Sequence, residues 1–231
     1  IAAVGDSFLF GFGVSVEDSL PETLENDLAE SYPGTKWEVL NFGVTGYHLI
    51  DNRITIQEKA LRFAPDLIIL GYVLNDPQVE PVWPLAAHFA ETRWWQHSNL
   101  LRGVAQLKNE SRVRRSGEGD YIRYLHTDPE VWNQAANAIQ DIGRIAKTEK
   151  VPILLVLFPL LPEADADWSS YPYTDLHRQV EQEAKNSGMM MLDLTPSLTV
   201  HSPADLRLSD RDGHLNEKGN RIAAQSIRMF L

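Results

Sequence analysis

The sequence predicts an α/β fold in which helices cover both faces of one parallel β-sheet, and two observations predict it. First, five short apolar runs, each closed by a turn signal, have the character of buried parallel strands. Second, segments with helical periodicity lie between most of these runs. Because parallel strands need long crossover connections, strands that alternate with helices indicate a parallel sheet. We therefore expect a three-layer α/β/α domain.

The expected strands are rich in valine, isoleucine, leucine and methionine, and each one ends at a polar residue or a glycine. A sheet of this kind with the strand order 2-1-3-4-5 is flavodoxin-like, and we expect that order here. The five strands are expected at Ile1–Val4, Trp37–Asn41, Asp66–Gly71, Ile153–Phe158 and Met189–Leu194.

The expected helices carry apolar residues on one face. In the first of them Leu24 and Leu28 are four residues apart, and Pro21 suits the first turn of a helix. In the third, alanine and isoleucine residues form a single stripe from Ala135 to Ile145. The five helices are expected at Pro21–Tyr32, Ile50–Phe63, Val131–Lys147, Thr174–Ser187 and Asn216–Phe230.

One long segment interrupts the alternation of strands and helices. We expect residues 1–231 to form a single domain with an insertion at residues 77–128, after the third strand, because this segment is far longer than an ordinary loop. It contains Trp83, Trp94 and Trp95, which form either a local hydrophobic cluster or the wall of a lid over a site; we favour the cluster. Since the chain starts within a strand, we also expect residues upstream of Ile1, so the localisation stays open.

The composition excludes several classes of function. The net charge of −11 argues against a nucleic-acid partner, because such proteins gather lysine and arginine on one surface. The chain has no cysteine, so disulfides, thiolate catalysis and cysteine-bound zinc are excluded. No apolar run has the length of a membrane span. The histidines show no metal-binding spacing, and we expect neither a metal nor a cofactor.

Three of the expected strands run into turns that carry candidate site residues. Ser7 follows the first strand, Gly46 the second and Asn75 the third, and a loop near the end of the chain carries His214. In an open parallel sheet, ligands bind beyond the carboxyl ends of the strands. With the order 2-1-3-4-5, the ends of the first three strands are neighbours, and the returning loop is long enough to reach them.

Four sequence blocks of this chain resemble those of the SGNH hydrolase superfamily, also called GDSL esterases and lipases. The blocks are "GDSF" with Ser7, "NFGVTG" with Gly46, "LND" with Asn75 and "DGHLN" with His214, and they span most of the chain. The extended form "GDSFLFGFGV" resembles the branch of bacterial carbohydrate acetylesterases and O-acetyltransferases. The resemblance implies a serine esterase that uses these four residues.

Two positions depart from the pattern of the family. Its third block usually begins with glycine two residues before the asparagine, where this chain has Val73. Its last block usually has aspartate three residues before the histidine, where this chain has Arg211, which cannot accept a hydrogen bond from an imidazole. Residues two apart lie on the same side of an extended chain, so we favour Asp212 over Asp210 as the carboxylate that orients His214. A dyad without such a carboxylate is the remaining alternative.

The chemistry assigned to these residues is ester hydrolysis through an acyl-enzyme on Ser7. His214 would act as the base, Asp212 would orient it, and the backbone N–H groups of Ser7 and Gly46 would form an oxyanion hole with the Asn75 amide. We expect short acyl esters, such as O-acetyl groups of carbohydrates, as substrates. The alternatives are an O-acyltransferase with the same residues and a non-catalytic carbohydrate-binding module. Residues expected to line the substrate are Tyr72, Trp83, Trp94 and Trp95.

Overall fold

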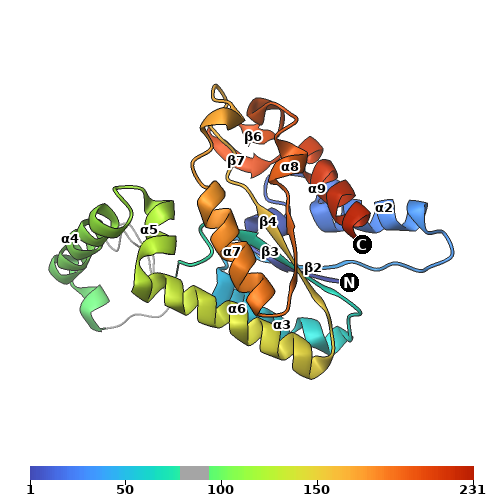
Figure 1. Cartoon of the computed structure of the whole chain (residues 1–231), viewed down its shortest axis with the longest axis horizontal. Coiled ribbons are helices and arrows are strands. Elements are labelled where there is room, and N and C mark those ends of the chain that lie inside the picture. Colours follow the sequence, from blue (N-terminus) through green and yellow to red (C-terminus); the bar gives the residue numbers. More distant parts are fainter. Residues whose placement is uncertain (79–93) are drawn as a thin grey trace. The chain divides into compact units, whose positions relative to one another are not determined.

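The computed structural model of the chain describes residues 1–78 and 94–231 (Figure 1). The chain divides into two compact units. The first unit comprises residues 1–76 and 136–231, and the second comprises residues 77–135. The second unit is the insertion expected after the third strand, extended at its carboxyl end to residue 135.

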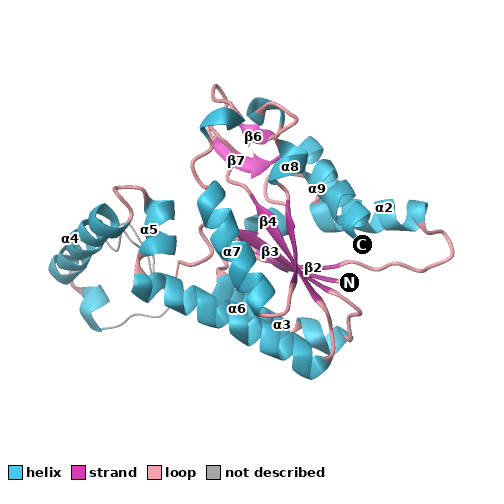
Figure 2. Ribbon diagram, viewed as in Figure 1, coloured by secondary structure: helices cyan, strands magenta, loops and turns pink. Residues whose placement is uncertain are grey.

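The first unit is built on a five-stranded parallel sheet with the order β2-β1-β3-β4-β5, which confirms the expected fold and strand order (Figure 2). Because β1 lies between β2 and β3, the ends of these three strands are neighbours at one edge of the sheet. Polar residues that follow them can therefore meet. The strands are β1 (Ala2–Gly5), β2 (Leu40–Gly43), β3 (Ile68–Val73), β4 (Ile153–Phe158) and β5 (Met190–Asp193).

The second strand lies further along the chain than its apolar run predicts. It was expected at Trp37–Asn41 but spans Leu40–Gly43, where Leu40 pairs with Ala2 and Gly43 with Gly5. As an edge strand, β2 is only partly buried, so its own sequence carries little apolar signal. Trp37 instead packs beside the core from the preceding loop. The register with β1 therefore decides where β2 lies.

Helices cover both faces of the sheet (Figures 1 and 2). Side chains of α2 (Leu20–Ser31) and α9 (Glu217–Phe230) join alternate residues of β1, β3 and β4 in one hydrophobic cluster, which includes Leu24, Ala223 and Ile227. On the opposite face lie α3 (Leu49–Glu58), α7 (Thr174–Asn186) and the carboxyl-terminal part of α6 (Pro129–Glu149). This burial on both faces explains why β3 and β4 are apolar throughout.

The five expected helices are present as α2, α3, α6, α7 and α9, although the fourteen residues expected as one second helix form α3 and a separate 3-10 helix, η2 (Ala60–Phe63). Short elements were not expected. They are α1 (Ser7–Phe10), α8 (Thr195–Leu198), the antiparallel pair β6 (Arg207–Ser209) and β7 (Asp212–Leu215), and the 3-10 helices η1 (Val16–Asp18), η4 (Trp168–Ser170) and η5 (Pro203–Asp205).

The second unit contains η3 (Trp94–His97), α4 (Asn99–Ser116), α5 (Tyr121–Thr127) and the first residues of α6. A small cluster of Val113, Tyr124 and Leu125 packs between α4 and α5. The Arg112 guanidinium donates to both carboxylate oxygens of Asp128, at 2.6 and 3.2 Å. Because these hydrogen bonds favour the ionised carboxylate, the pKa of Asp128 is lowered despite the opposing effect of burial.

Candidate active site

Ser7 lies at the point where β1 turns into the short helix α1. The carboxylate of Asp6 accepts a hydrogen bond from the Phe8 backbone N–H at 3.0 Å, so Asp6 caps α1. The Ser7 hydroxyl also lies 3.5 Å from the Asp6 carboxylate, at the outer limit of a hydrogen bond. The strand-to-helix turn thus presents Ser7 beyond the carboxyl end of a central strand.

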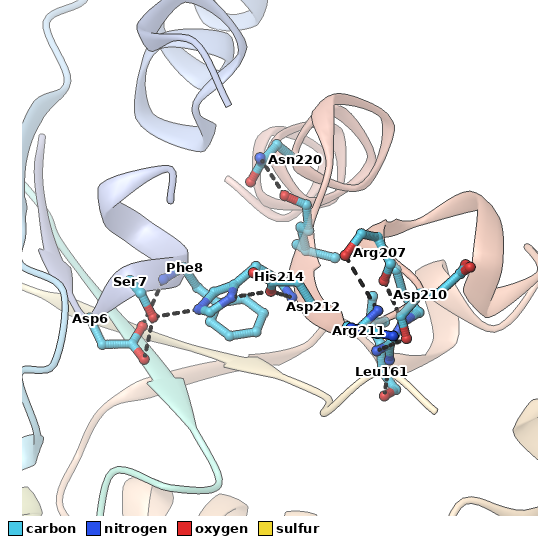
Figure 3. A network of polar contacts seen from close by, with 12 residues as sticks. Asp6, Ser7, Phe8, Leu161, Arg207, Asp210, Arg211, Asp212, His214 and Asn220 are labelled. Carbon is cyan, nitrogen blue, oxygen red and sulfur yellow. Dashed lines mark hydrogen bonds and ion pairs between the residues drawn. The ribbon is translucent and has the colours of Figure 1, made fainter. Parts of the chain in front are cut away.

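The structure brings Ser7, His214 and Asp212 together in one chain of hydrogen bonds (Figure 3). His214 Nε2 lies 2.8 Å from Ser7 Oγ, and His214 Nδ1 lies 2.6 Å from Asp212 Oδ1. Because a carboxylate can only accept, Nδ1 carries the proton and Nε2 is free to accept the hydrogen bond from the Ser7 hydroxyl. Ser7 is buried, whereas the side chains of His214 and Asp212 are about one third exposed.

The surroundings of Asp212 favour its ionised carboxylate, which accepts the hydrogen bond from the imidazole. Its Oδ1 accepts a second hydrogen bond, from the His214 backbone N–H at 3.0 Å. This backbone bond is the main reason that the pKa of Asp212 is lowered, and the His214 side chain adds to the effect. Asp212 and His214 are both in β7, two residues apart, as the alternation of side chains along a strand requires. Asp210 is exposed, and its backbone carbonyl accepts from Arg207 instead.

Asn75 lies in a tight turn directly after β3. The Asp76 N–H donates to the Val73 carbonyl at 2.9 Å, and the Val73 N–H donates to the Asp76 carboxylate at 3.2 Å. These two bonds close the turn around Val73, the residue that replaces the usual glycine of the family. Asp76 is fully buried, and burial, together with the charge of Asp6, raises its pKa well above the ordinary value.

Gly46 lies in the loop that follows β2, at a φ of +81°. This left-handed conformation is strained for residues other than glycine. A Cβ atom there would meet no heavy atom within 4 Å, so the turn requires glycine because of its backbone angle rather than for lack of space. Gly46 is exposed, and it is not among the residues that line the cavity next to Ser7.

A cavity of about 440 Å³ opens beside the serine and the histidine. Asn75 lines this cavity together with Ser7, and Leu160 and Leu161 contribute apolar surface from the segment that follows β4. Within the described part of the chain, neither the Asn75 amide nor the backbone N–H groups of Ser7 and Gly46 have a hydrogen-bond acceptor. The full set of lining residues is Asp6, Ser7, Phe8, Asn75, Leu160, Leu161, Arg211, Asp212, Gly213 and His214.

Two aromatic rings that were not predicted as site residues contact the imidazole. The ring of Phe8 lies 5.0 Å from that of His214, and the ring of Phe12 lies 4.8 Å away, as measured between centroids. Phe8 is buried, whereas Phe12 is 39% exposed. Phe8 belongs to α1, whereas Phe12 follows the left-handed Gly11 that ends this helix, so no helical spacing in the sequence marks the pair.

The residues expected to line the substrate have different positions. Tyr72 is fully buried within the central strand β3, so its assignment as a lining residue is wrong: a side chain without exposed area cannot be contacted by a substrate. Trp94 and Trp95 form part of η3 in the second unit, and their role stays a prediction. Trp83 lies outside the described residues.

No group of three or more acidic, histidine or cysteine side chains in residues 1–78 and 94–231 could hold a metal ion. Of the helices described, none combines the length and the apolar character needed to cross a membrane. His177 is satisfied within the fold, because it is buried between Asp193 and Tyr171, at 2.9 and 2.8 Å.

A serine, a histidine and a carboxylate joined in this way, at the carboxyl ends of a parallel sheet, have the arrangement found in serine hydrolases. The chain belongs to the GDSL-like lipase/acylhydrolase family, whose model matches residues 3–222. The resemblance inferred from the four sequence blocks is therefore confirmed. No curated protein matches the chain.

Solved structures share the fold at low sequence identity. An acetyl xylan esterase, AlAXEase, is 17% identical with a TM-score of 0.61, over 100% of this chain and 98% of its own. A catalytic mutant of an acetylxylan esterase from Geobacillus stearothermophilus is 15% identical with a TM-score of 0.61, over 99% and 91%. An α/β hydrolase from the metagenome of Lake Arreo, Spain, is 16% identical with a TM-score of 0.61, over 99% and 92%.

Proposed function

We propose that this member of the family hydrolyses short-chain acyl esters, such as O-acetyl groups on carbohydrates, through an acyl-enzyme on Ser7. The observation that carries the proposal is the 2.8 Å separation between Ser7 Oγ and His214 Nε2. A serine hydroxyl is a weak nucleophile, and a base within hydrogen-bond reach is what activates it. The hydrogen bond of Asp212 to Nδ1 supports the assignment of His214 as that base.

In the first half of the reaction, Ser7 Oγ attacks the ester carbonyl while its proton passes to His214 Nε2. The tetrahedral intermediate collapses when the C–O bond to the alcohol breaks, and the alcohol leaves with the proton from Nε2. In the second half, a water molecule gives a proton to Nε2 and its oxygen attacks the acyl carbon. Collapse of that intermediate releases the carboxylic acid and returns the proton to Ser7.

Negative charge develops on the carbonyl oxygen in both halves, and hydrogen-bond donors must meet it. We assign this role to the Asn75 amide and to the Ser7 N–H, because both residues line the cavity and neither donor has an acceptor in the described chain. Gly46 is the third proposed donor. Its assignment depends on the sequence block and on its place after β2, beside β1.

The preference for short acyl groups is supported by the cavity. Its volume of about 440 Å³ is near the lower end of the range for small-molecule sites, about 300–1,000 Å³. Leu160 and Leu161 offer apolar contact to an acyl group in a cavity of this size. Among the structural neighbours, two are acetyl xylan esterases, which favours acetyl groups on a carbohydrate.

The nucleophile is tested with a fluorophosphonate probe and intact-mass measurement. We expect one adduct on the wild-type chain, none on Ser7→Ala, and normal labelling of Ser15→Ala, whose hydroxyl bonds to Asp18 rather than to a histidine. Equal labelling of the wild type and Ser7→Ala would contradict the proposal. A non-catalytic carbohydrate-binding module would neither be labelled nor release nitrophenol from p-nitrophenyl acetate.

The substrate class is tested with p-nitrophenyl esters of increasing acyl length and with acetylated xylo-oligosaccharides. We expect kcat/KM to be highest for acetyl and to fall steadily with each added carbon. Highest activity on long acyl chains would overturn the assignment of a short acyl group. An acyltransferase would instead produce an acetylated acceptor when a sugar is added, in place of free acetate, and product analysis separates the two reactions.

A further inference from the structure

Arg207 is a buried cation outside the group of residues assigned to catalysis. It lies in β6 and is 7% exposed. Its nearest carboxylate is that of Glu163, at 3.9 Å, and the Glu163 side chain is 78% exposed. Burying a guanidinium is costly unless hydrogen bonds satisfy it. A charge kept in such a place therefore indicates a specific task.

The hydrogen bonds of Arg207 all go to backbone carbonyls, and these belong to two different segments (Figure 3). In the segment after β4, Nη1 donates to Leu161 at 3.1 Å and to Pro162 at 2.8 Å. At the end of β6 and in the turn that follows it, Nε donates to Ser209 at 3.2 Å and Nη2 to Asp210 at 3.3 Å. One planar group thus joins two parts of the chain that have no sheet pairing with each other.

These two segments both line the cavity beside Ser7. One contributes Leu160 and Leu161, and the other contributes residues 211–214, including His214 itself. The turn held by Arg207 comes directly before Asp212. Any movement of this turn would therefore displace the carboxylate from the imidazole and the imidazole from Ser7.

The element that carries Asp212 and His214 needs such support. It is a two-stranded antiparallel pair separate from the main sheet, and an isolated pair of strands is marginally stable. Its register is irregular between Arg207 and Ser209, where the ladder loses its regular hydrogen bonds. At the other end of β7, Asn216 donates to the carbonyls of Asp205 and Arg207, both at 3.0 Å. At the β6–β7 turn, the hydrogen bonds of Arg207 hold the pair in place.

We propose that Arg207 is a positioning residue, which holds the Asp212–His214 strand against the Leu160–Leu161 wall so that the imidazole and the cavity keep a fixed relation to Ser7. The inference rests on the proposed function for its effect on catalysis, but the positioning itself can be measured without turnover. The positive charge of Arg207 also helps to lower the pKa of Asp212, which keeps that carboxylate ionised.

The test compares Arg207→Ala, Arg207→Lys and the control Arg221→Ala, which removes an exposed arginine from α9. We expect Arg207→Ala to lose about 100-fold in kcat on p-nitrophenyl acetate with a small change in KM, the size of effect produced by misplacing reacting groups by about 1 Å. Because the Leu160–Leu161 segment of the cavity is no longer held, the preference of Arg207→Ala for acetyl over butyryl esters should also weaken. The kcat of Arg207→Lys should lie between those of the wild type and Arg207→Ala, since an ammonium has three donors but lacks the planar geometry of a guanidinium.

Two further measurements distinguish positioning from a general loss of structure. Free guanidinium, at concentrations well below those that unfold the protein, should restore part of the activity of Arg207→Ala and none to Ser7→Ala. The downfield proton resonance of His214 Nδ1–H, hydrogen-bonded to Asp212, should be present in the wild type and in Arg221→Ala, lost in Arg207→Ala and recovered with guanidinium. If Arg207→Ala does not fold, the same resonance and kcat are measured on Arg207→Lys.

The outcomes separate this inference from the proposed function. An Arg207→Ala protein that keeps the resonance, the acyl preference and the wild-type kcat would overturn the positioning role while leaving the esterase intact. A wild-type protein without esterase activity, whose resonance still depends on Arg207, would overturn the proposed function and support the positioning role.

Discussion

Asp212 and His214 are joined twice through a single oxygen: Asp212 Oδ1 accepts both the backbone N–H of His214, at 3.0 Å, and its Nδ1–H, at 2.6 Å. The backbone hydrogen bond holds the Asp212 carboxylate in place independently of the imidazole. The side-chain hydrogen bond fixes the orientation of the His214 ring and its tautomer. A spacing of two residues thus allows a carboxylate to contact the imidazole, where the usual block of the family has a spacing of three.

Asp212→Asn should therefore lower kcat about 10⁴-fold, because an amide in place of the carboxylate favours the wrong tautomer of the imidazole. Asp210→Asn should retain most of the activity, since the Asp210 side chain is exposed. Steady-state kinetics on p-nitrophenyl acetate compare the two. If Asp210→Asn were the inactive variant, the assignment of the orienting carboxylate would be reversed.

Asn75→Ala should reduce kcat by about 10²–10³-fold, the usual cost of removing one oxyanion-hole donor, with KM nearly unchanged. The matched control is Asn186→Ala, at the exposed carboxyl end of α7, which should leave kcat as in the wild type. A rise in KM at constant kcat would show instead that the amide binds the substrate in its ground state.

Phe12→Ala should lower kcat by about tenfold or less, because it removes one of the two rings that hold the imidazole without touching the hydrogen bonds. Phe10→Ala is the control: Phe10 is also exposed and lies on the same short segment, but its ring does not contact His214. Kinetics with thermal unfolding of both variants test this. An equal loss of kcat in the two variants would assign the effect to α1 as a whole.

Asp76→Asn should change how stability depends on pH. Because the folded-state pKa of Asp76 lies above its unfolded value of 3.8, the folded protein binds this proton more tightly, and stability falls as pH rises from 3.8 through the raised pKa. An asparagine can still accept from the Val73 N–H but does not titrate. Relative to the wild type, Asp76→Asn should gain in unfolding temperature as pH rises from about 4 to neutrality.

The control for that measurement is Asp165→Asn, an exposed aspartate whose replacement should leave the pH profile of the unfolding temperature as in the wild type. Parallel profiles for the wild type and Asp76→Asn would mean that burial does not raise the pKa of Asp76.

The strands and most helices could be predicted because they depend on local signals, and the strand order followed from the flavodoxin-like arrangement that such elements adopt. Continuous apolar runs mark strands that are buried on both faces, and Ile153–Phe158 was expected at the bounds of β4. β2 was misplaced because an edge strand carries little apolar pattern, so its register with β1 decides its position. Tyr72 was assigned to the substrate from its residue type alone, and its burial follows from the place of β3 between β1 and β4.

The remaining site residues depend on contacts between distant parts of the chain. Arg207 was not singled out, because its partners at Leu161 and Pro162 are backbone carbonyls more than forty residues away, and a carbonyl leaves no mark in the sequence. Phe8 and Phe12 were passed over because their contact with His214 exists only once the β6–β7 pair has returned to α1. Such residues are found from a structure rather than from periodicity.

Ser7 and His214 are separated by 207 positions in the chain. During synthesis the proposed nucleophile Ser7 emerges 207 positions before His214, so the pair cannot form until β7 has emerged and this very long loop has closed. A product that ends before β7 would lack the proposed base, and under the proposed function it would show no esterase activity.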